Sequence, residues 1–342
     1  MNMVQFCTAK ALTPAHPDKL ASLIADRMLD ACLANDPMAR VDCRVQIAQK
    51  EILVFGEIAS LSMPKVRETA AMALRSVGLL PSDYTIRTAI HQRAPGIASK
   101  DELCIVNGYA YDETSELLPM PVILAERLTA GIGYACAEGE IEGLFPGGQA
   151  MVTVEYDENG KPLRLEHASI VLQHSGKLPD EKVRRRAAEQ IIQPALTLLP
   201  PDEQSQLFVT ILPPKVQFRV SVSEPLSGKS PDNMERSGNL MARYIAKNLV
   251  AAGLASQCQV TLAYAVGIAK PVMVTVNSFG TGKICADDCL ADVVRQVFKL
   301  EKHQVIAELK LREPQYGDAL LGRRQSLWER TDKVKELQDA VL

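Results

Sequence analysis

The sequence predicts an α+β fold of three related units, each with a strand pair followed by an amphipathic helix. Strand pairs are expected at residues 45–47 with 52–58, 150–156 with 163–172, and 259–266 with 272–279. The second pair is joined through Asn159-Gly160, and Asn-Gly between alternating segments is a strong hairpin signal. Corresponding turns and helices recur about 110 residues apart, which predicts a threefold internal repeat.

The helices follow from apolar residues spaced three and four positions apart. The first amphipathic helix begins after Pro64 and places Val66, Ala70 and Leu74 on one face. The others are expected after Asp180 and at 286–298, and longer helices at 18–34, 119–130 and 231–252. No flexible linker separates these elements, so we expect tightly packed units with approximate ranges 1–115, 116–225 and 226–342.

Composition and charge exclude several classes of protein. The 342 residues are 47% hydrophobic and 23% charged, with a net charge of −3. There is no basic excess to favour nucleic acid, and no apolar run reaches the roughly 18 residues of a membrane span. The first ten residues lack the pattern of a secretion signal. We therefore expect a cytoplasmic protein with neither nucleic acid nor membrane as partner.

The eight cysteines are scattered along the chain. Only Cys285 and Cys289 lie close together, four residues apart within an expected helix, and no histidine completes a zinc-ligand spacing. We interpret the cysteines as reduced thiols of a cytosolic protein, with a structural zinc site as the less favoured alternative.

The first segment that could carry chemistry is His-Pro-Asp-Lys at residues 16–19, at the start of the first long helix. Proline suits the first helical position, and the free amides of a helix start favour an anion. His16 could donate to a leaving oxygen of a phosphate while Asp18 holds Mg²⁺. The alternative is a carboxylate that satisfies helix-terminal amides beside a solvated histidine.

The second segment is Gly-Lys-Ser-Pro at residues 228–231, which also precedes a helix. Ser223 stands where a P-loop requires its first glycine, so a P-loop is rejected. An anion site at Lys229 and a plain helix cap at Ser230 both remain open.

Charged or polar residues also stand at the ends of apolar runs. Glu57 and His174 end two expected strands, and Arg93 follows a shorter apolar segment. A charge at a strand end often reaches a cleft mouth. A partly exposed salt bridge is an equally good interpretation of each residue alone.

Taken in order, the motifs of this chain resemble the S-adenosylmethionine synthetase (methionine adenosyltransferase) family over nearly its whole length. The matching segments are residues 12–19, 36–41, 56–58, 108–114, 118–121, 173–175, 227–231, 242–254, 264–269, 279–281 and 328–332. The resemblance implies three pseudo-threefold-related α+β domains with interleaved connections. It also implies a transferase in which methionine sulfur attacks C5′ of ATP and expels tripolyphosphate, which is then hydrolysed. Family members use two Mg²⁺ ions and a monovalent cation, at sites between two subunits.

For the phosphate side of the site, the resemblance assigns four residues. His16 would stabilise the leaving oxygen and Lys229 would contact phosphate, as catalytic residues. Asp18 would hold a Mg²⁺, and Glu235 stands where the family has a metal-binding Asp.

For the organic part of the substrates, the resemblance assigns four more residues. Glu57 would contact the methionine amino group, and Arg93 replaces a Gln that faces the methionine carboxylate. Glu102 stands where the family uses an Asp near the substrate, and Phe218 aligns with the ring that stacks on adenine. A forked guanidinium at Arg93 could strengthen carboxylate binding.

The departures from the family pattern cluster around the phosphate chain. Gly147 and Gln149 stand where an Asp and a phosphate-binding Lys are expected, and Asn233 replaces another Lys. About twenty family residues, including an Arg-Lys pair, are missing between residues 218 and 227. Arg44 replaces a Glu that helps to bind the monovalent cation, which makes a K⁺ requirement doubtful.

Removing several cations from the cradle of a polyanion should cost several kcal/mol of transition-state stabilisation. In the family, the lost groups come largely from one subunit's half of each site. We therefore expect S-adenosylmethionine synthesis from ATP and methionine, in a homodimer or, as we favour, a hetero-oligomer with a second synthetase-like subunit. The alternatives are a non-catalytic regulatory subunit and an adenosyltransferase with a changed sulfur or nucleotide substrate.

Overall fold

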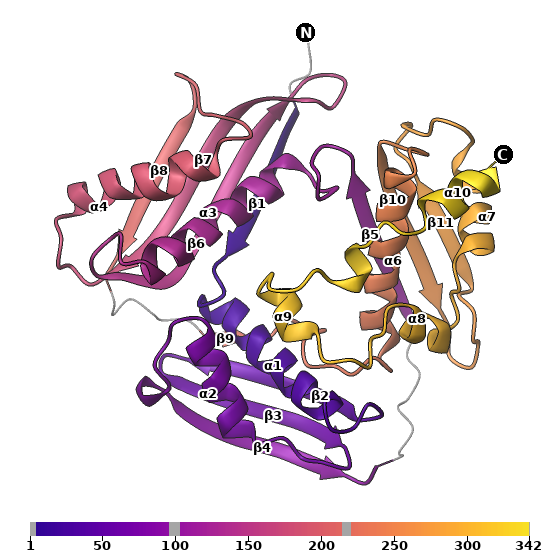
Figure 1. The fold of residues 1–342 in the computed structure, drawn as a ribbon, viewed down its shortest axis with the longest axis horizontal. Helices are drawn as coiled ribbons and strands as arrows, with labels where there is room; N and C mark the ends of the chain where they lie inside the picture. The colour runs from indigo at the N-terminus through magenta and orange to yellow at the C-terminus, as the bar shows by residue number, and fades with distance from the viewer. Residues whose placement is uncertain (1–4, 96–102, 214–219, 342) are drawn as a thin grey trace.

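A computed structural model describes residues 5–95, 103–213 and 220–341 of the chain and contains three sheet-and-helix units (Figure 1). The order strand–helix–strand–strand–helix–strand occurs twice, and a third repeat replaces the last strand by helices. The first repeat consists of β1 (Gln5–Leu12), α1 (Pro17–Leu33), β2 (Arg40–Ala48), β3 (Glu51–Ala59), α2 (Val66–Ser76) and β4 (Thr85–Arg93), with a 3₁₀ turn at Pro81–Asp83.

The second and third repeats continue this order. The second consists of β5 (Cys104–Tyr111), α3 (Met120–Ala137), β6 (Leu144–Tyr156), β7 (Pro162–His174), α4 (Asp180–Ala187), a π turn (Ala188–Ile192), α5 (Gln193–Ala195) and β8 (Gln206–Leu212). The third consists of β9 (Val220–Val222), α6 (Met234–Ala251), β10 (Gln257–Tyr264), β11 (Met273–Asn277), α7 (Asp287–Val297), α8 (Lys302–Glu308), α9 (Tyr316–Leu320), a 3₁₀ turn (Leu327–Glu329) and α10 (Val334–Val341).

The three units exchange strands in a cycle. The N-terminal sheet has the order β4-β3-β2-β9, the central sheet β1-β6-β7-β8, and the C-terminal sheet β11-β10-β5. The first strand of each repeat pairs with another repeat: β1 is antiparallel to β6, β5 to β10, and β9 to β2. The predicted three-unit α+β fold with interleaved connections is confirmed. We keep 1–115, 116–225 and 226–342 as a proposed division, because each range contains one hairpin and helices that cover it.

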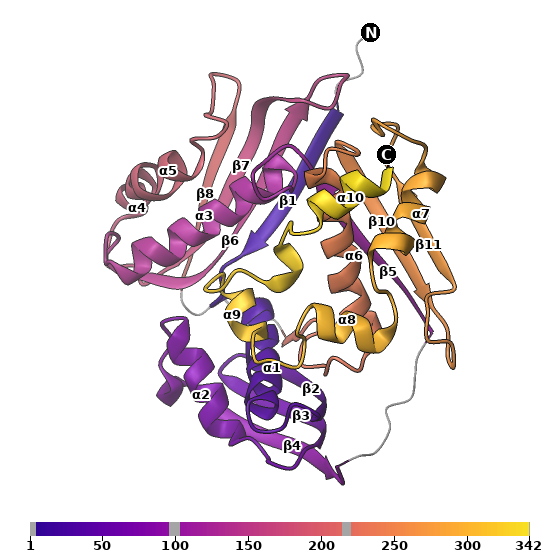
Figure 2. The same cartoon turned by 45° about the vertical axis from the view of Figure 1, so that its right-hand side comes forward.

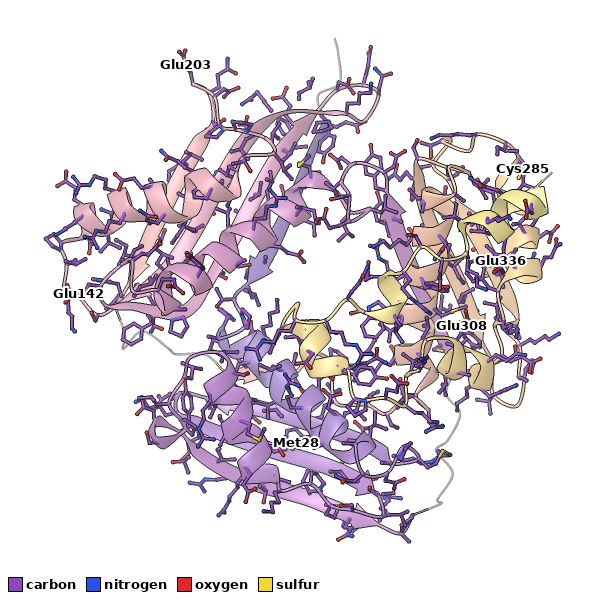
Figure 3. The ribbon with its side chains drawn as sticks, viewed as in Figure 1. Met28, Glu142, Glu203, Cys285, Glu308 and Glu336 are labelled. Carbon is purple, nitrogen blue, oxygen red and sulfur yellow. The ribbon has the colours of Figure 1, made fainter. Side chains whose placement is uncertain are left out.

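Each sheet is covered by helices on one face only. Buried apolar residues of α1 and α2, α3 and α4, and α6 and α7 form three separate cores with their sheets; Met28 of α1, labelled in Figure 3, is fully buried in the first. Elsewhere the sheets expose large apolar side chains, among them Phe6, Ile105, Met151 and Met273. Such exposed apolar surface is typical of an interface between proteins.

The C-terminal segment ties the units together. Figures 1 and 2 show the segment with α9 lying between the three units. Its backbone is held by Asp30 of α1, whose carboxylate accepts hydrogen bonds from the N–H groups of Gln315, Tyr316 and Gly317 at 2.8–3.0 Å. This contact joins the first and last parts of the chain into one body.

Two sequence expectations about elements are wrong. The helix expected at 119–130 continues through Gly131 to Ala137, and Gly131 lies close to Ile191: a Cβ there would lie 3.2 Å from that side chain. Cys285 precedes α7 instead of lying within it, and all eight cysteines are free thiols. Among the helices of the described ranges, none is long and apolar enough to cross a membrane.

Candidate active site

A cleft of about 970 Å³ lies between the N-terminal and C-terminal units. Its walls come from the ends of β2, β3 and β4 on one side, and from residues 229–234, 264–269 and α8 on the other. The cleft brings together three residues that the sequence singled out, Glu57, Arg93 and Lys229.

Glu57 and Arg93 contact each other across neighbouring strands. They lie on the parallel strands β3 and β4, and Nη2 of Arg93 donates to Oε1 of Glu57 at 2.7 Å. Both side chains are about half exposed, at 48% and 46%. The sequence left a substrate role and a partly exposed salt bridge open for each residue; the structure confirms the salt bridge and shows that the two residues are each other's partners. A carboxylate beside a guanidinium matches the ammonium and carboxylate groups of a free amino acid.

Part of the cleft wall is apolar. Ile268, Ile306, Ala59 and Tyr264 line it together with the Glu57–Arg93 pair. The side chain of Ile268 is 53% exposed. A charged pair beside an apolar wall is the arrangement that binds an amino acid with an uncharged side chain.

Lys229 belongs to a loop that is held against the N-terminal sheet. The N–H of Cys43 donates to the Gly228 carbonyl at 3.1 Å, and the N–H of Ser230 donates to the Val41 carbonyl at 2.8 Å. Gly228 has φ of 73°, and a Cβ there would lie 2.2 Å from the Cys43 oxygen, so only glycine fits.

The helix-cap interpretation of Ser230 is wrong. Helix α6 begins at Met234, not at residue 231, and its N-cap is Asn233, whose side chain accepts from the N–H of Arg236 at 3.0 Å. The segment before it turns along the N-terminal sheet, because its amides and carbonyls pair there. The loop is thus placed to present Lys229 at the cleft.

His16 and Asp18 lie in a second region, at the start of α1. His16 is the N-cap and its Nδ1 accepts from the N–H of Asp18 at 3.3 Å, so the expected helix start is present. Neither residue lines the cleft. The preceding segment pairs with the central unit, where the N–H of Thr13 donates to the Gly148 carbonyl at 3.0 Å.

The two regions are well separated within one chain. The Lys229 loop touches α1 at Asp26, which accepts from the N–H of Gly228 at 2.8 Å. Asp26 lies ten residues after His16, which corresponds to about 15 Å along a helix. His16 and the contact of the Lys229 loop therefore lie at different levels of α1, and only Lys229 of the two lines the cleft.

Two uncharged residues that depart from the family pattern, Gly147 and Gln149, lie beside the start of α1. A Cβ on Gly147 would lie 3.7 Å from the Ala15 carbonyl, and Gln149 of β6 is paired with Leu12 of β1. The next residue of α1 after Asp18, Lys19, interacts with Glu126 of α3. Desolvation lowers the pKa of Lys19, and that carboxylate opposes the shift.

The chain offers single carboxylates for a metal ion. Within the described ranges, no group of three or more His, Cys, Asp or Glu could hold one. Asp18 lies at the start of α1, and Glu235 lies in the first turn of α6, next to the cleft residue Met234. Mg²⁺ is commonly held by one or two carboxylates together with substrate phosphates and water. This donor set therefore fits Mg²⁺ that arrives with a nucleotide.

The Arg44 guanidinium binds two backbone carbonyls. Its Nη1 donates to the carbonyls of Ser223 and Glu224 at 3.3 and 3.1 Å. Two further candidates from the sequence, Glu102 and Phe218, lie outside the residues that the structure describes.

Sequence reasoning missed one ion pair in the cleft wall. Nη2 of Arg312 donates to Oδ1 of Asp232 at 3.0 Å, and both residues line the cleft. They lie 80 residues apart, and no local motif connects them. Only the path of the C-terminal segment brings them together.

Together, these features define a three-domain α+β protein with exchanged strands and a candidate site divided between two regions. Models of the S-adenosylmethionine synthetase N-terminal, central and C-terminal domains match residues 4–95, 98–215 and 219–330. The chain belongs to the S-adenosylmethionine synthetase family, whose members are transferases that use ATP and methionine.

Proposed function

We propose that this chain takes part in S-adenosylmethionine synthesis from ATP and methionine, paired with a second synthetase-like chain that completes the phosphate site. The observation that carries this proposal is the cleft in which the Glu57–Arg93 ion pair, an apolar wall and Lys229 meet. These are the groups needed for an amino acid and an anion held side by side.

The ion pair binds the amino acid head. The carboxylate of Glu57 accepts from the ammonium group of methionine, and the guanidinium of Arg93 donates to its carboxylate. The thioether chain then lies against Ile268 and Ile306. Fixing both ends of the amino acid orients the sulfur lone pair, and such orientation supplies much of the rate of a direct displacement.

The phosphate-side residues stabilise the leaving group. The new bond joins sulfur to C5′ of ATP, and the electrons of the broken C5′–O bond remain on tripolyphosphate. His16 donates a hydrogen bond to that oxygen, and Lys229 offsets the negative charge electrostatically. Asp18 and Glu235 would hold Mg²⁺, which neutralises phosphate charge when it is bound.

A complete site requires a second subunit. His16 and Lys229 belong to regions about 15 Å apart along α1 in one chain. A partner packed on the open sheet faces can bring its own helix start to this chain's cleft. Because Gly147 and Gln149 leave this chain's helix start without the family's charged neighbours, we favour a more complete synthetase-like partner over a second copy.

Two further properties belong to the same proposal. Arg44 already fills the carbonyl site near residues 223 and 224, so activity does not depend on K⁺. We place the protein in the cytoplasm, since eight free cysteines suit a reducing compartment.

A changed amino acid substrate is the second candidate function. It is favoured by Arg93, a cation at a position where the family has an uncharged Gln, and by the salt bridge that it forms with Glu57. Such a protein would still transfer an adenosyl group but would prefer another sulfur amino acid over methionine.

The test is product formation by the chain with and without its partner. Purified chain is incubated with ATP, methionine, Mg²⁺ and K⁺, alone and with the second synthetase-like chain of the same source, and S-adenosylmethionine is quantified by mass spectrometry. We expect robust product formation only in the mixture. Robust synthesis by the chain alone would rule out the pairing requirement, and absence of both product and nucleotide binding in the mixture would refute the function.

A further inference from the structure

We propose that Arg236 is a positioning residue for the anion-contacting loop 226–230, and that it fixes Lys229 through backbone contacts and through Asp26. The inference rests on the proposed function, in which Lys229 contacts the phosphate chain. Arg236 does not line the cleft, so it would act only through other groups.

The guanidinium of Arg236 holds both ends of the loop. Its Nη1 donates to the carbonyl of Leu226 at 2.8 Å and to the carbonyl of Lys229 at 3.1 Å. Its Nη2 donates to Oδ1 of Asp26 at 2.8 Å, and the same oxygen accepts from the N–H of Gly228 at 2.8 Å. The loop is thereby clamped from α6 and from α1.

The C-terminal segment covers another side of the Asp26–Arg236 ion pair. The guanidinium carbon of Arg236 lies 4.2 Å from the ring centroid of Tyr316. Tyr316 is itself fixed, because its N–H donates to Asp30 and its hydroxyl donates to the Leu311 carbonyl at 2.7 Å. Arg236 therefore sits where three distant segments of the chain converge.

A buried ion pair is poor evidence for stability alone, since apolar residues of similar volume often stabilise a fold as well or better. Asp26 and Arg236 are only 4% and 8% exposed. Their donors and acceptors point to the backbone of one loop, in which Gly228 has a positive φ and approaches the Cys43 carbonyl closely. A binding group works only when its support holds it within about 0.5 Å. These contacts suit placement of Lys229.

The test variant is Arg236→Lys, which keeps the charge beside Asp26 but lacks the fork that reaches two carbonyls. Affinities for inorganic tripolyphosphate and for methionine are measured by titration calorimetry on the product-forming assembly, alongside the unfolding temperature. We expect tripolyphosphate affinity to fall about tenfold, and methionine affinity to change less than twofold, because Glu57 and Arg93 make no contact with Arg236.

The matched control is Arg295→Lys. Arg295 also bonds one carboxylate and one carbonyl, those of Asp292 and Val274, but it lies on α7 away from the cleft. We expect both affinities to stay unchanged in this variant. If Arg236→Lys lowers only the unfolding temperature, or weakens both ligands equally, Arg236 is structural and the inference is wrong.

Two more variants separate this inference from the proposed function. Asp26→Asn keeps an acceptor for the N–H of Gly228 but removes the charge. We expect this variant to fold even if Arg236→Lys fails to fold, and to lower the affinity for tripolyphosphate about threefold. Unchanged tripolyphosphate affinity in Asp26→Asn would overturn the inference. Lys229→Met tests the loop itself: if it leaves tripolyphosphate binding intact, the phosphate role of Lys229 fails and the positioning role with it. If Lys229→Met weakens binding but Arg236→Lys does not, only the positioning role fails.

Discussion

The cleft and the start of α1 differ in the charge that surrounds their functional residues. The cleft has three carboxylates, those of Asp42, Glu57 and Asp232, and a larger set of cations. These cations are Arg40, Arg93, Lys229, Lys302 and Arg312. At the start of α1, His16 and Asp18 have the uncharged residues Gly147 and Gln149 close to their segment.

The two regions therefore differ in how they would treat an anionic ligand. Charge lining a cleft attracts an anionic ligand and stabilises developing negative charge. The cleft side keeps that property, whereas the helix-start side keeps a hydrogen-bond donor and a carboxylate, and its Lys19 interacts with Glu126 of α3. A protein whose two halves differ in this way is suited to a partner that is complete where this chain is deficient.

The largest effect is expected at the helix start. His16→Ala removes the donor to the leaving oxygen at the site that this chain's helix start forms with the partner's cleft. Turnover at that site should fall about 100-fold, while its nucleotide affinity changes less than threefold. His16→Asn, whose side-chain amide can still donate a hydrogen bond, should lose less turnover. Steady-state kinetics of the product-forming assembly, with nucleotide affinity from calorimetry, make the measurement. Equal losses in turnover and affinity would mean that His16 only binds, and that the helix start has no catalytic role.

On the cleft side, Arg93→Gln should raise the KM for methionine about tenfold with kcat within twofold, because the charged contact with the carboxylate is lost. The matched control is Arg87→Gln. Arg87 pairs with Glu51 at 3.1 Å across the same two strands, but outside the cleft. Methioninol, which lacks the carboxylate, should be used equally well by Arg93→Gln and the unsubstituted protein. A KM for methionine that stays constant would remove Arg93 from the amino acid site.

Adding a positive charge at the start of α1 should reduce the difference in charge between that region and the cleft. Gln149→Lys places a cation next to the His16 segment, and it should raise S-adenosylmethionine synthesis by the chain alone about fivefold. Gln149→Met, of similar length and no charge, should give no gain. Rates are compared by mass spectrometry without the partner. If Gln149→Lys does not raise the rate of synthesis, the missing charge at this position does not limit the activity of the chain.

Local sequence patterns predicted the elements well, because their causes are local. The hairpins, the helix start at His16 and the amphipathic helix after Pro64 follow from turn residues and apolar spacing. The end of α3 was missed because Gly131 and Gly133 lower the local helix propensity, whereas the fold packs Gly131 close to Ile191, 60 residues away. The cap of α6 was missed because the segment at Ser230 pairs with Val41 of another unit.

The same distinction between local and long-range causes applies to the candidate site. Motif and strand-end chemistry pointed to His16, Lys229, Glu57 and Arg93, and the resemblance to the family added their roles. Neither could show that Glu57 and Arg93 bond each other, that Asp26 and Arg236 clamp the Lys229 loop, or that His16 does not line the cleft. Those facts depend on which strands and segments the fold places side by side.

The smallest expected effect concerns Arg44, where the N-terminal sheet carries its own cation. Because Arg44 already bonds the carbonyls of Ser223 and Glu224, rates of the unsubstituted protein in K⁺ and in Na⁺ should agree within about 1.5-fold. Arg44→Glu exchanges the cation for a carboxylate, which frees the carbonyls for a metal ion. It should therefore introduce a K⁺ stimulation of about threefold. Arg44→Gln, which adds no carboxylate, should show less. The measurement is the reaction rate over a K⁺ titration at constant ionic strength. A strong K⁺ requirement of the unsubstituted protein would show that the guanidinium of Arg44 does not replace the ion.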